Sequence, residues 1–561
     1  MLNHRFAHTM KLGFLLVFLI SVPALPQTSA QKEIPKSALA GRVVKDPGSV
    51  PVKKAEVQLM AEGQEEGTNY TTTTDADGHF QIESIRHGRY RVFVERTGLV
   101  EIDKRNRRSP GTALSFEPGK DVSGLVLHLL PAAVVVGRVL DEDGDPMART
   151  DVSVLHYGYT LGHRRLETAA SGTTNDLGEY RVPDLLPGRY LAVVNPSPAF
   201  SNPSGVAASA QSAGEKEETA YVPTYYPGTT DRSQAGFLEL RAGDETSVNF
   251  NLVPSATFHV RGSLAPNPGS AMLLLRPKES NAEYAAAHVD KDGKFDIGHV
   301  PPGSYTLVTV TGTAESPQLA QQMIDVTNHD INDSRILTMA GSRVRGQLHL
   351  DGDLSLDVSS LLVFLEPGDR DHVTSFFGGD DIATNLTLAR VKRDGSFDLK
   401  DVPAGSYFVL VEGNSTPEYF LKSVRVGGSD VTDTGLSVGG GGTYSLDLLL
   451  GAGTARVNGG VTDADDHPVA DAVVVAVPQL SRRNRLELFG KAVTDQHGRF
   501  TLTGLTPGEY QLFAFDSIEE GAYYDPGFLQ AFDARGEKIR LEEKGSKTVP
   551  LKVIASSSDD R

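Results

Sequence analysis

One block of sequence recurs five times along this 561-residue chain and constrains its fold more than any other feature. Each copy carries a glycine, a second glycine ten residues later, and a tyrosine two residues beyond the second glycine. Because repeated supersecondary units build arrays of similar domains, the chain is predicted to contain five copies of one fold. The copies are DADGHFQIESIRHGRYRVFV (75–94), NDLGEYRVPDLLPGRYLAVV (175–194), DKDGKFDIGHVPPGSYTLVT (290–309), KRDGSFDLKDVPAGSYFVLV (392–411) and DQHGRFTLTGLTPGEYQLFA (495–514).

The block reads as two β-strands joined by tight turns. The first glycine is expected in a turn that needs a positive φ, and the alternating apolar and polar residues after it suit a strand with one buried face. The second glycine turns the chain across the end of the domain, and the tyrosine begins the next strand, as in the tyrosine corner of immunoglobulin-like sandwiches. The predicted corner pairs, structural in role, are Gly88 and Tyr90, Gly188 and Tyr190, Gly303 and Tyr305, Gly405 and Tyr407, and Gly508 and Tyr510.

Strand–turn–strand motifs open the units. The first, second and fifth units begin with GRVVKDPGSVPVKKAEVQLM (41–60), GRVLDEDGDPMARTDVSVL (137–155) and GGVTDADDHPVADAVVVAV (459–477), whereas the third and fourth openings depart from this pattern. The sequence therefore predicts an all-β chain of five tandem β-sandwiches that contact mainly their neighbours along the chain. Their predicted ranges are 34–131, 132–253, 254–339, 340–450 and 451–555.

The opening motif, combined with the T-D-x-x-G-x-F and L-x-P-G-x-Y elements of the repeated block, resembles the carboxypeptidase regulatory-like domain. The resemblance covers nearly all of the chain after its N-terminal segment and is strongest in the first, second and fifth units. It implies transthyretin-like (prealbumin-like) β-sandwiches, often grouped with carbohydrate-binding-like folds. It implies little about function, because sandwiches of this type serve many tasks.

The N-terminal segment is typical of a secretory signal peptide. Arg5 and Lys11 supply positive charge, and LGFLLVFLISV (12–22) is an apolar stretch too short to span a membrane. Cleavage after Ala30 is expected, with Ala24 as the alternative. Signal peptide 1–30 then precedes a mature chain without a transmembrane segment, which is secreted, periplasmic or on the cell surface of a bacterium.

Composition excludes several classes of function. The formal charge of −18 becomes about −20 without residues 1–30, so nucleic acid is not an expected partner. With no cysteine, the chain has neither disulfides nor thiolate metal sites. The metallocarboxypeptidases that give the family its name add a zinc-dependent catalytic domain, but no H-x-x-E, HExxH or G-x-S-x-G element occurs here. We expect no catalytic residue, no cofactor and no metal, and therefore no enzyme.

Acidic residues before the turn glycines raise the alternative of a calcium site. Asp75 and Asp77 precede the first turn, and Asp290 and Asp292 precede the third. The equivalent positions hold Leu177 in the second unit and Lys392 in the fourth, and two carboxylates fall short of the ~6–8 oxygens that calcium needs. An ordinary hairpin turn is the favoured interpretation.

Basic loops at 103–110, 163–167 and 481–487 are interpreted as solvated surfaces, with an anionic partner as the alternative. Residues 196–219 are expected to form a flexible insertion. Two aromatic loops, YVPTYYPGTTDR (221–232) and GAYYDPGF (521–528), are candidate ligand platforms. In each loop one ring is expected to point inward and one outward; alternatively, the rings fold onto their own domain. The candidate platform residues are Tyr225, Tyr226, Tyr523 and Tyr524.

The function predicted from sequence is that of a secreted, non-catalytic interaction or scaffold protein of the cell envelope. A carbohydrate-binding module array is one alternative, and the accessory region of an extracellular enzyme complex is another. The expected partner is a polysaccharide, an envelope polymer or another surface protein.

Overall fold

The computed structural model describes residues 34–62, 69–102, 109–196, 218–266, 271–278, 285–313, 316–352, 356–368, 387–413 and 419–555. The predicted signal peptide, most of the basic loop 103–110 and most of the insertion 196–219 lie outside these residues. The chain divides into an N-terminal unit, Met1–Pro35, and a second unit, Lys36–Arg561, to which every element below belongs.

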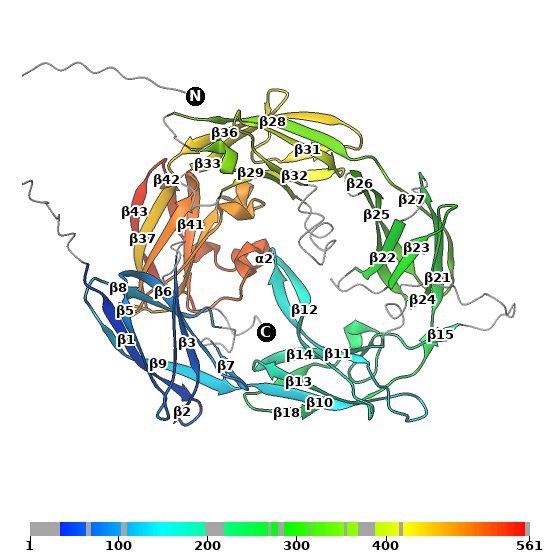
Figure 1. The fold of residues 1–561 in the computed structure, drawn as a ribbon, viewed down its shortest axis with the longest axis horizontal. Helices are drawn as coiled ribbons and strands as arrows, with labels where there is room; N and C mark the ends of the chain where they lie inside the picture. The colour runs from blue at the N-terminus through cyan, green and yellow to red at the C-terminus, as the bar shows by residue number, and fades with distance from the viewer. Residues whose placement is uncertain are drawn as a thin grey trace, which may run out of the picture. The chain divides into compact units, whose positions relative to one another are not determined.

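The predicted all-β fold class is confirmed, and the same two-sheet plan recurs in each repeat (Figure 1). In the first sheet, a central strand pairs antiparallel with the strand after the turn glycine and parallel with the closing strand. The central strands are β1 (Ser37–Lys45), β10 (Ala133–Leu140), β21 (Phe258–Ala265), β28 (Ser342–Leu350) and β37 (Ala455–Thr462). Their antiparallel partners are β5 (His79–Ile85), β13 (Glu179–Leu185), β24 (Lys294–Val300), β31 (Ser396–Val402) and β40 (Arg499–Leu505). The parallel partners are β9 (Val122–Pro131), β18 (Glu245–Ser247) with β19 (Phe250–Asn251), β27 (Ile331–Leu337), β36 (Thr443–Ala452) and β43 (Ser546–Lys552).

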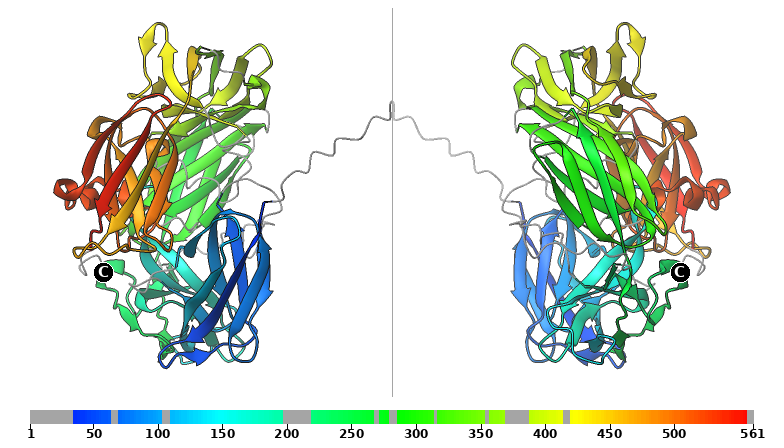
Figure 2. Two further views of the ribbon diagram at one scale, coloured as in Figure 1. Left: turned by 90° about the vertical axis from the view of Figure 1, so that its left-hand side faces the viewer. Right: turned by 90° about the vertical axis from the view of Figure 1, so that its right-hand side faces the viewer.

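The second sheet of each repeat is antiparallel and contains the strand that begins at the corner glycine. Figure 2 shows the strands of the third repeat in green. The strand order is β4 (Tyr70–Thr73), β3 (Glu56–Ala61), β6 (Gly88–Glu95), β8 (Thr112–Phe116) in the first repeat, and β12 (His163–Thr173), β11 (Asp151–Thr160), β14 (Gly188–Asn195), then β16 (Thr224–Tyr225) and β17 (Leu238–Leu240) in the second. It is β23 (Ala285–Val289), β22 (Ala271–Pro277), β25 (Gly303–Thr313), β26 (Ser316–Val326) in the third repeat, and β30 (Leu388–Arg390), β29 (Leu362–Pro367), β32 (Gly405–Glu412), β35 (Leu436–Val438) in the fourth. In the fifth repeat it is β39 (Gly490–Val493), β38 (Val473–Pro478), β41 (Gly508–Phe515), β42 (Glu537–Leu541).

Short elements complete the described chain. The remaining strands are β2 (Val50–Pro51), β7 (Leu99–Glu101), β15 (Thr219–Ala220), β20 (Ser255–Ala256), β33 (Tyr419–Val426) and β34 (Ser429–Asp430). The helical turns are η1 (Arg232–Gln234), η2 (Val358–Ser360), η3 (Leu480–Arg482), η4 (Leu486–Leu488), η5 (Ala522–Tyr524), α2 (Pro526–Gln530) and η6 (Asp533–Arg535).

Five apolar clusters form the cores, and each draws its buried residues from within one predicted range. The cluster of the first repeat runs from Leu39 to Leu129, and that of the fifth from Ala455 to Leu551. The side chains come from the inward faces of both sheets, which is how a β-sandwich hides its apolar surface. The exact boundaries of the five ranges stay a prediction.

A glycine in each central strand lies directly beneath an aromatic ring of the neighbouring strand. In the fifth repeat, Gly459 pairs with Phe500, and a Cβ added at Gly459 would lie 2.6 Å from that ring and 2.0 Å from the carbonyl oxygen of Val549. The ring therefore occupies the space that a side chain would need. The other pairs are Gly41 with Phe80, Gly137 with Tyr180, Gly262 with Phe295 and Gly346 with Phe397, so the third and fourth repeats open on the same strand as the others.

The turn glycines adopt the predicted positive φ in all five repeats. Their φ angles are 77° at Gly78, 70° at Gly178, 78° at Gly293, 81° at Gly395 and 70° at Gly498. A second left-handed position, unforeseen from the sequence, lies four residues before each corner glycine, where the register with the central strand shifts as in a β-bulge. Its occupants are Ser84, Asp184, His299, Asp401 and Gly504, with φ between 56° and 75°.

Candidate functional site

The corner tyrosines are buried and most of them bond back to their own chain. In the fourth repeat, the Tyr407 hydroxyl donates to the carbonyl oxygen of Pro403 at 2.8 Å. Tyr90, Tyr190 and Tyr305 make the same bond to the carbonyl four residues earlier, at 3.1, 2.9 and 2.9 Å. Tyr510 differs, because its buried hydroxyl has no hydrogen-bond partner among the residues that the structure describes. The corner thus holds its ring inside the sandwich rather than presenting it to a ligand.

The corner glycines do not all adopt a left-handed conformation. Positive φ occurs at Gly88 (150°) and Gly508 (154°), but not at Gly405. A Cβ at Gly405 would instead lie 3.3 Å from the Tyr407 ring. The constraint at this corner is therefore close packing against the tyrosine.

Removing single hydroxyl groups should separate the two kinds of corner. We expect Tyr407→Phe to destabilise the fourth repeat by ~0.5–1.5 kcal/mol, because it deletes one hydrogen bond. The matched change Tyr510→Phe should be neutral or stabilising, because it removes a buried hydroxyl that has no partner. Hydrogen exchange of peptides from each repeat measures both. Equal costs at the two positions would contradict this difference.

Burial also makes the corners sensitive to alkaline pH. It raises the pKa of Tyr190, Tyr407 and Tyr510 to about 12. Since an unfolded tyrosine titrates near ~10, the stability that these groups contribute is complete below pH ~10 and is lost as the pH rises from ~10 through ~12. We expect their phenolate absorbance to appear together with loss of the β circular dichroism signal. Complete titration near pH 10 with an unchanged fold would show that the rings are not buried.

The aromatic loop of the fifth repeat folds onto its own domain. Tyr523 is only 3% exposed, and its hydroxyl donates to Glu520 Oε1 at 2.8 Å. Tyr524 is half-buried, with its ring centroid 5.0 Å from that of Phe489. The prediction that Tyr523 is a ligand-platform residue is therefore wrong. Residues 518–532 cover the outer face of β38 and β41 and bury the Tyr523 ring in a sixth apolar cluster.

This sixth cluster also receives side chains from two other repeats. Ala113 of β8 is one of its buried members, and Tyr159 of β11 packs against it. The Tyr159 ring meets Phe528 at a centroid distance of 6.4 Å. The loop that the sequence offered as a ligand platform is thus part of the packing among the first, second and fifth repeats.

The aromatic loop of the second repeat is half-buried. Tyr225 pairs with Val193 at the sheet edge, and burial raises the pKa of its hydroxyl. Tyr226 packs on the core of its repeat, with its ring edge-to-face with Phe250 at 6.4 Å. Ligand binding by Tyr225, Tyr226 and Tyr524 stays a prediction.

The acidic turns are held by internal hydrogen bonds. Asp75 Oδ1 accepts from the backbone N–H groups of Asp77 and His79, at 2.9 and 2.8 Å. Asn175, Asp290 and Asp495 accept equivalent pairs of bonds. These side chains therefore shape hairpin turns, as an aspartate or asparagine commonly does. Among the described residues, one His/Asp group has metal-compatible spacing, the exposed turn of Asp463, Asp465 and His467.

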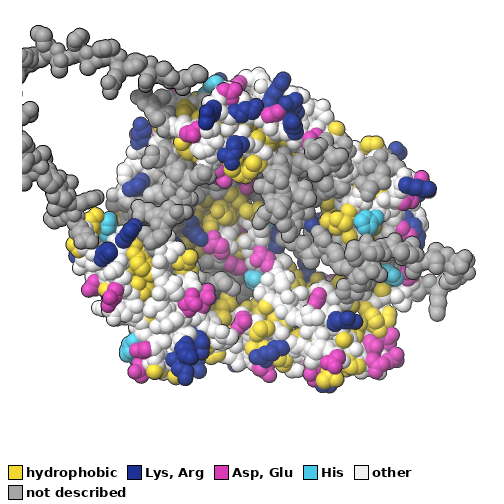
Figure 3. Space-filling view, viewed as in Figure 1, with side chains coloured by type: hydrophobic (Ala, Val, Ile, Leu, Met, Phe, Trp, Pro, Cys, Tyr) yellow, Lys and Arg dark blue, Asp and Glu magenta, His cyan; other side chains and the backbone are white. Residues whose placement is uncertain are grey.

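The basic loop 481–487 is not a solvated surface, so that interpretation is wrong. Arg485 is 2% exposed, and its Nη1 lies 2.8 Å from Asp433 of the fourth repeat. Arg482 Nε reaches the same carboxylate at 3.0 Å. The anionic group that this loop meets belongs to the neighbouring repeat. On the face shown in Figure 3, other Lys and Arg side chains are interspersed with Asp and Glu.

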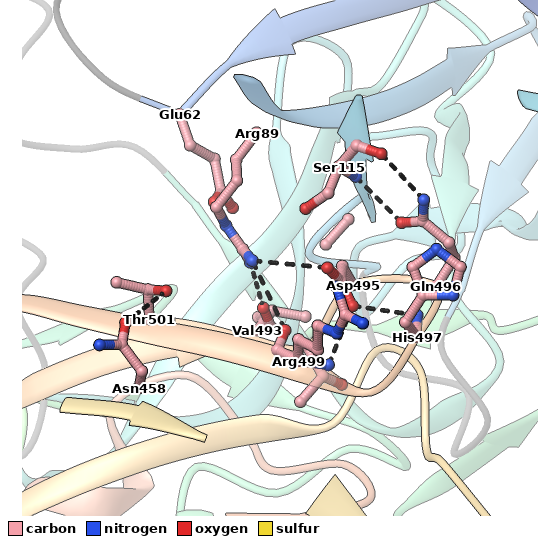
Figure 4. Close-up of polar contacts among 12 residues, drawn as sticks. Glu62, Arg89, Ser115, Asn458, Val493, Asp495, Gln496, His497, Arg499 and Thr501 are labelled. Atoms are coloured by element: carbon pink, nitrogen blue, oxygen red, sulfur yellow. Dashed lines mark hydrogen bonds and ion pairs between the residues drawn. The ribbon is translucent and has the colours of Figure 1, made fainter. Parts of the chain in front are cut away.

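A polar contact joins the first and fifth repeats, 404 positions apart in sequence (Figure 4). Arg89, beside the first corner glycine, donates from Nη2 to the carbonyl oxygen of Val493 at 2.8 Å, while its Nε contacts Glu62 at 2.9 Å. Its Nη1 lies 3.9 Å from the buried carboxylate of Asp495. The sequence predicted contacts mainly between successive repeats, and it did not predict this contact between the first and fifth repeats.

The edge of strand β8 supplies the other half of the contact. Ser115 donates its N–H to Gln496 Oε1 and accepts from Gln496 Nε2, both at 2.9 Å, so the side-chain amide pairs with the strand as a neighbouring strand would. Ala113 N–H donates to Asp471 Oδ1 at 3.2 Å. These bonds satisfy backbone groups that an edge strand otherwise leaves exposed.

Gln496→Ala should release the backbone N–H and C=O of Ser115 without disturbing the sheet. We expect the Ser115 amide to exchange with solvent at least ~10-fold faster, because its hydrogen-bond acceptor is gone. The Leu114 and Phe116 amides are internal controls, since alternate residues of an antiparallel strand point their N–H groups to opposite sides. Hydrogen exchange followed by NMR resolves these amides. Unchanged exchange at Ser115 would show that Gln496 does not cover it.

These features define a class, a multi-repeat protein of immunoglobulin-like β-sandwiches whose repeated residues serve packing and turns. Residues 38–116 and 456–523 match the model of the carboxypeptidase regulatory-like domain. These two segments of the first and fifth repeats are therefore similar to carboxypeptidase regulatory-like domains.

Curated relatives cover part of the chain. The mouse protein "BOS complex subunit NOMO1" is 27% identical over 150 residues, 26% of this chain and 12% of that protein. The human "BOS complex subunit NOMO3" is 26% identical over 256 residues, 44% of this chain and 19% of that protein. The chain therefore spans about a fifth or less of the length of these relatives.

The solved structures to which the chain is similar include two pilins. GBS52, the minor pilin of Streptococcus agalactiae, is 12% identical with a TM-score of 0.21, covering 39% of this chain and 96% of its own. BcpA, the major pilin subunit of Bacillus cereus, is 11% identical with a TM-score of 0.15, covering 54% of this chain and 99% of its own. Among the described residues, no helix has the length and apolar character needed to cross a membrane.

Proposed function

We propose that this protein is a non-catalytic scaffold of the cell exterior, in which carboxypeptidase regulatory-like repeats are held together to present surfaces to other macromolecules. The observation that carries the proposal is the use made of the repeated residues. The turn aspartate, the central-strand glycine and the corner tyrosine all make contacts inside their own repeat. The repeated residues thus maintain the fold of each repeat, and the binding of partners is proposed for the surface residues that differ between the repeats.

Contacts between repeats support a scaffold role. Arg89 and Gln496 connect the first and fifth repeats, and Arg485 connects the fifth repeat to Asp433 of the fourth. Such contacts fix surfaces on different repeats relative to one another, which favours binding a large partner at several points. The curated relatives are named as subunits of a complex, which agrees with a role in assembly.

The family supports a non-catalytic role as well, because carboxypeptidase regulatory-like domains are non-catalytic modules. Purified protein should release no C-terminal residues from peptides, with or without added zinc. Cross-linking to intact cells of the source organism, followed by mass spectrometry, should recover a stoichiometric macromolecular partner. Zinc-dependent release of residues would overturn the proposal, and so would the absence of any partner on intact cells.

A carbohydrate-binding array remains the second candidate, with Tyr225, Tyr226 and Tyr524 as its half-buried aromatic residues. Stacking on a sugar adds only ~0.5–1.5 kcal/mol per ring beyond the buried area, so several rings must act on one polymer. A glycan array distinguishes the candidates. Polysaccharide binding that Tyr225→Ala and Tyr226→Ala together abolish in folded protein would favour the carbohydrate array.

A further inference from the structure

The contact between the first and fifth repeats is separate from the cores that it joins. Each of the five main apolar clusters lies within one repeat. The sixth cluster includes one buried residue from the first repeat, Ala113. The described bonds across the contact are few and polar, and they involve Arg89, Ala113 and Ser115. The contact can therefore open while every sandwich core stays intact.

The two surfaces differ and are complementary. The first repeat offers the outward N–H and C=O groups of an edge strand, with the guanidinium of Arg89 beside them. The fifth repeat offers the Gln496 amide, the Asp471 carboxylate and the carbonyl of Val493. A contact between unlike surfaces can close within one chain, or it can join one copy to the next in head-to-tail order.

We propose that this contact is exchangeable between copies of the protein. Strand β8 of one chain then docks on the fifth repeat of a second copy through the same bonds that it makes within its own chain. The partner is a second copy of this chain, because that copy carries the complementary amide, carboxylate and carbonyl groups in the required arrangement.

Concentration decides between the two forms. Two surfaces joined by a short flexible linker meet at an effective concentration on the order of millimolar, which we take as the scale for the contact within one chain. In micromolar solution the contact is therefore mainly within one chain, and the form between chains grows as the protein concentration approaches that value. Protein crowded on a surface reaches such concentrations.

Absence of cysteine makes a direct test available. Glu117 and His497 are exposed residues on opposite sides of the contact, two positions after Ser115 and one position after Gln496, which bond to each other. Cysteine at these positions leaves Ser115 and Gln496 in place. The double variant, Glu117→Cys with His497→Cys, reports the contact within a chain when treated with a short bis-maleimide. An equimolar mixture of the two single variants reports the contact between chains.

We expect the double variant to cross-link within one chain in dilute solution. The mixture of single variants should give a two-chain product whose yield rises at least ~5-fold as each protein goes from ~10 μM to ~500 μM. Val50→Cys replaces Glu117→Cys in the control mixture, because Val50 is exposed but lies on β2, in the other sheet. Gln496→Ala, added to the His497→Cys chain, should reduce the product at unchanged circular dichroism.

Three outcomes overturn the proposal. If the double variant cross-links but the mixture gives no two-chain product at any concentration, the contact belongs to single chains. If the Val50→Cys control gives the same yield, the product reflects random collision. If neither the double variant nor the mixture reacts, the contact is not kept in solution.

Discussion

Gly459→Ala is expected to destabilise the fifth repeat by about 3 kcal/mol, the upper part of the range for overpacked cores. The added methyl would lie 2.0 Å from the backbone oxygen of Val549 and 2.6 Å from the Phe500 ring. Backbone and a buried ring cannot both move away without disturbing the parallel pairing of β37 with β43. Hydrogen exchange of peptides from 455–551 measures the loss, since separate repeats need not unfold in one step.

The next residue provides a matched control. A Cβ at Gly460 would have as its nearest neighbour the carbonyl oxygen of Gly498, 3.9 Å away. Gly460→Ala should therefore be neutral or stabilise by up to ~1 kcal/mol, because it reduces the freedom of the unfolded chain. Similar losses from both substitutions would mean that the ring does not define the space above Gly459.

Thr494→Val is expected to cost ~2–4 kcal/mol, although the two side chains have nearly the same shape. Thr494 is fully buried; its hydroxyl accepts from Ala472 N–H at 2.8 Å and donates to the Val469 carbonyl at 2.7 Å. The substitution leaves the buried Ala472 N–H and the partly buried Val469 carbonyl without this partner, and each unsatisfied buried group costs ~1–3 kcal/mol. Denaturant unfolding followed by hydrogen exchange in the fifth repeat measures the change.

Thr494→Ser is the control for this position, because it keeps the hydroxyl and removes only a methyl group. It should cost less than Thr494→Val. Thr74 and Thr174 make the equivalent bridges in the first and second repeats, whereas the third and fourth repeats carry Val289 and Val391 there. A smaller loss from valine than from serine would show that volume, and not hydrogen bonding, determines stability at this site.

The repeated block was sufficient to predict the all-β plan and the left-handed turn glycines, because local spacing determines both. The openings of the third and fourth repeats were harder to assign, since they lack the proline-containing hairpin. Their common feature, Gly262 and Gly346 beneath Phe295 and Phe397, depends on pairing between distant strands. The left-handed bulge position, which Asp401 occupies in the fourth repeat, holds different residue types in different repeats. No residue type in the sequence therefore marks its conformation.

The candidate site was predicted less well. The run AVVVAV (472–477) lacks the alternation of a strand with one buried face, and it could have indicated that both faces of β38 are buried. Tyr523 would then have been expected in the covering layer. The contact of Arg89 with Val493 has no such signal, because it joins single groups 404 positions apart without any periodic pattern.

The second apolar face of the fifth repeat has a consequence for the order of the repeats. Val475, Phe513 and Phe515 lie on the outer face of its sheet and are covered by residues 518–532, with Ala113 from the first repeat and Tyr159 from the second. In the first repeat, the equivalent strand β3 carries Glu56, Gln58 and Met60 on that face. The five repeats share a plan but are not interchangeable: a rearranged chain that placed another repeat last would leave this covering layer without the neighbours against which it packs.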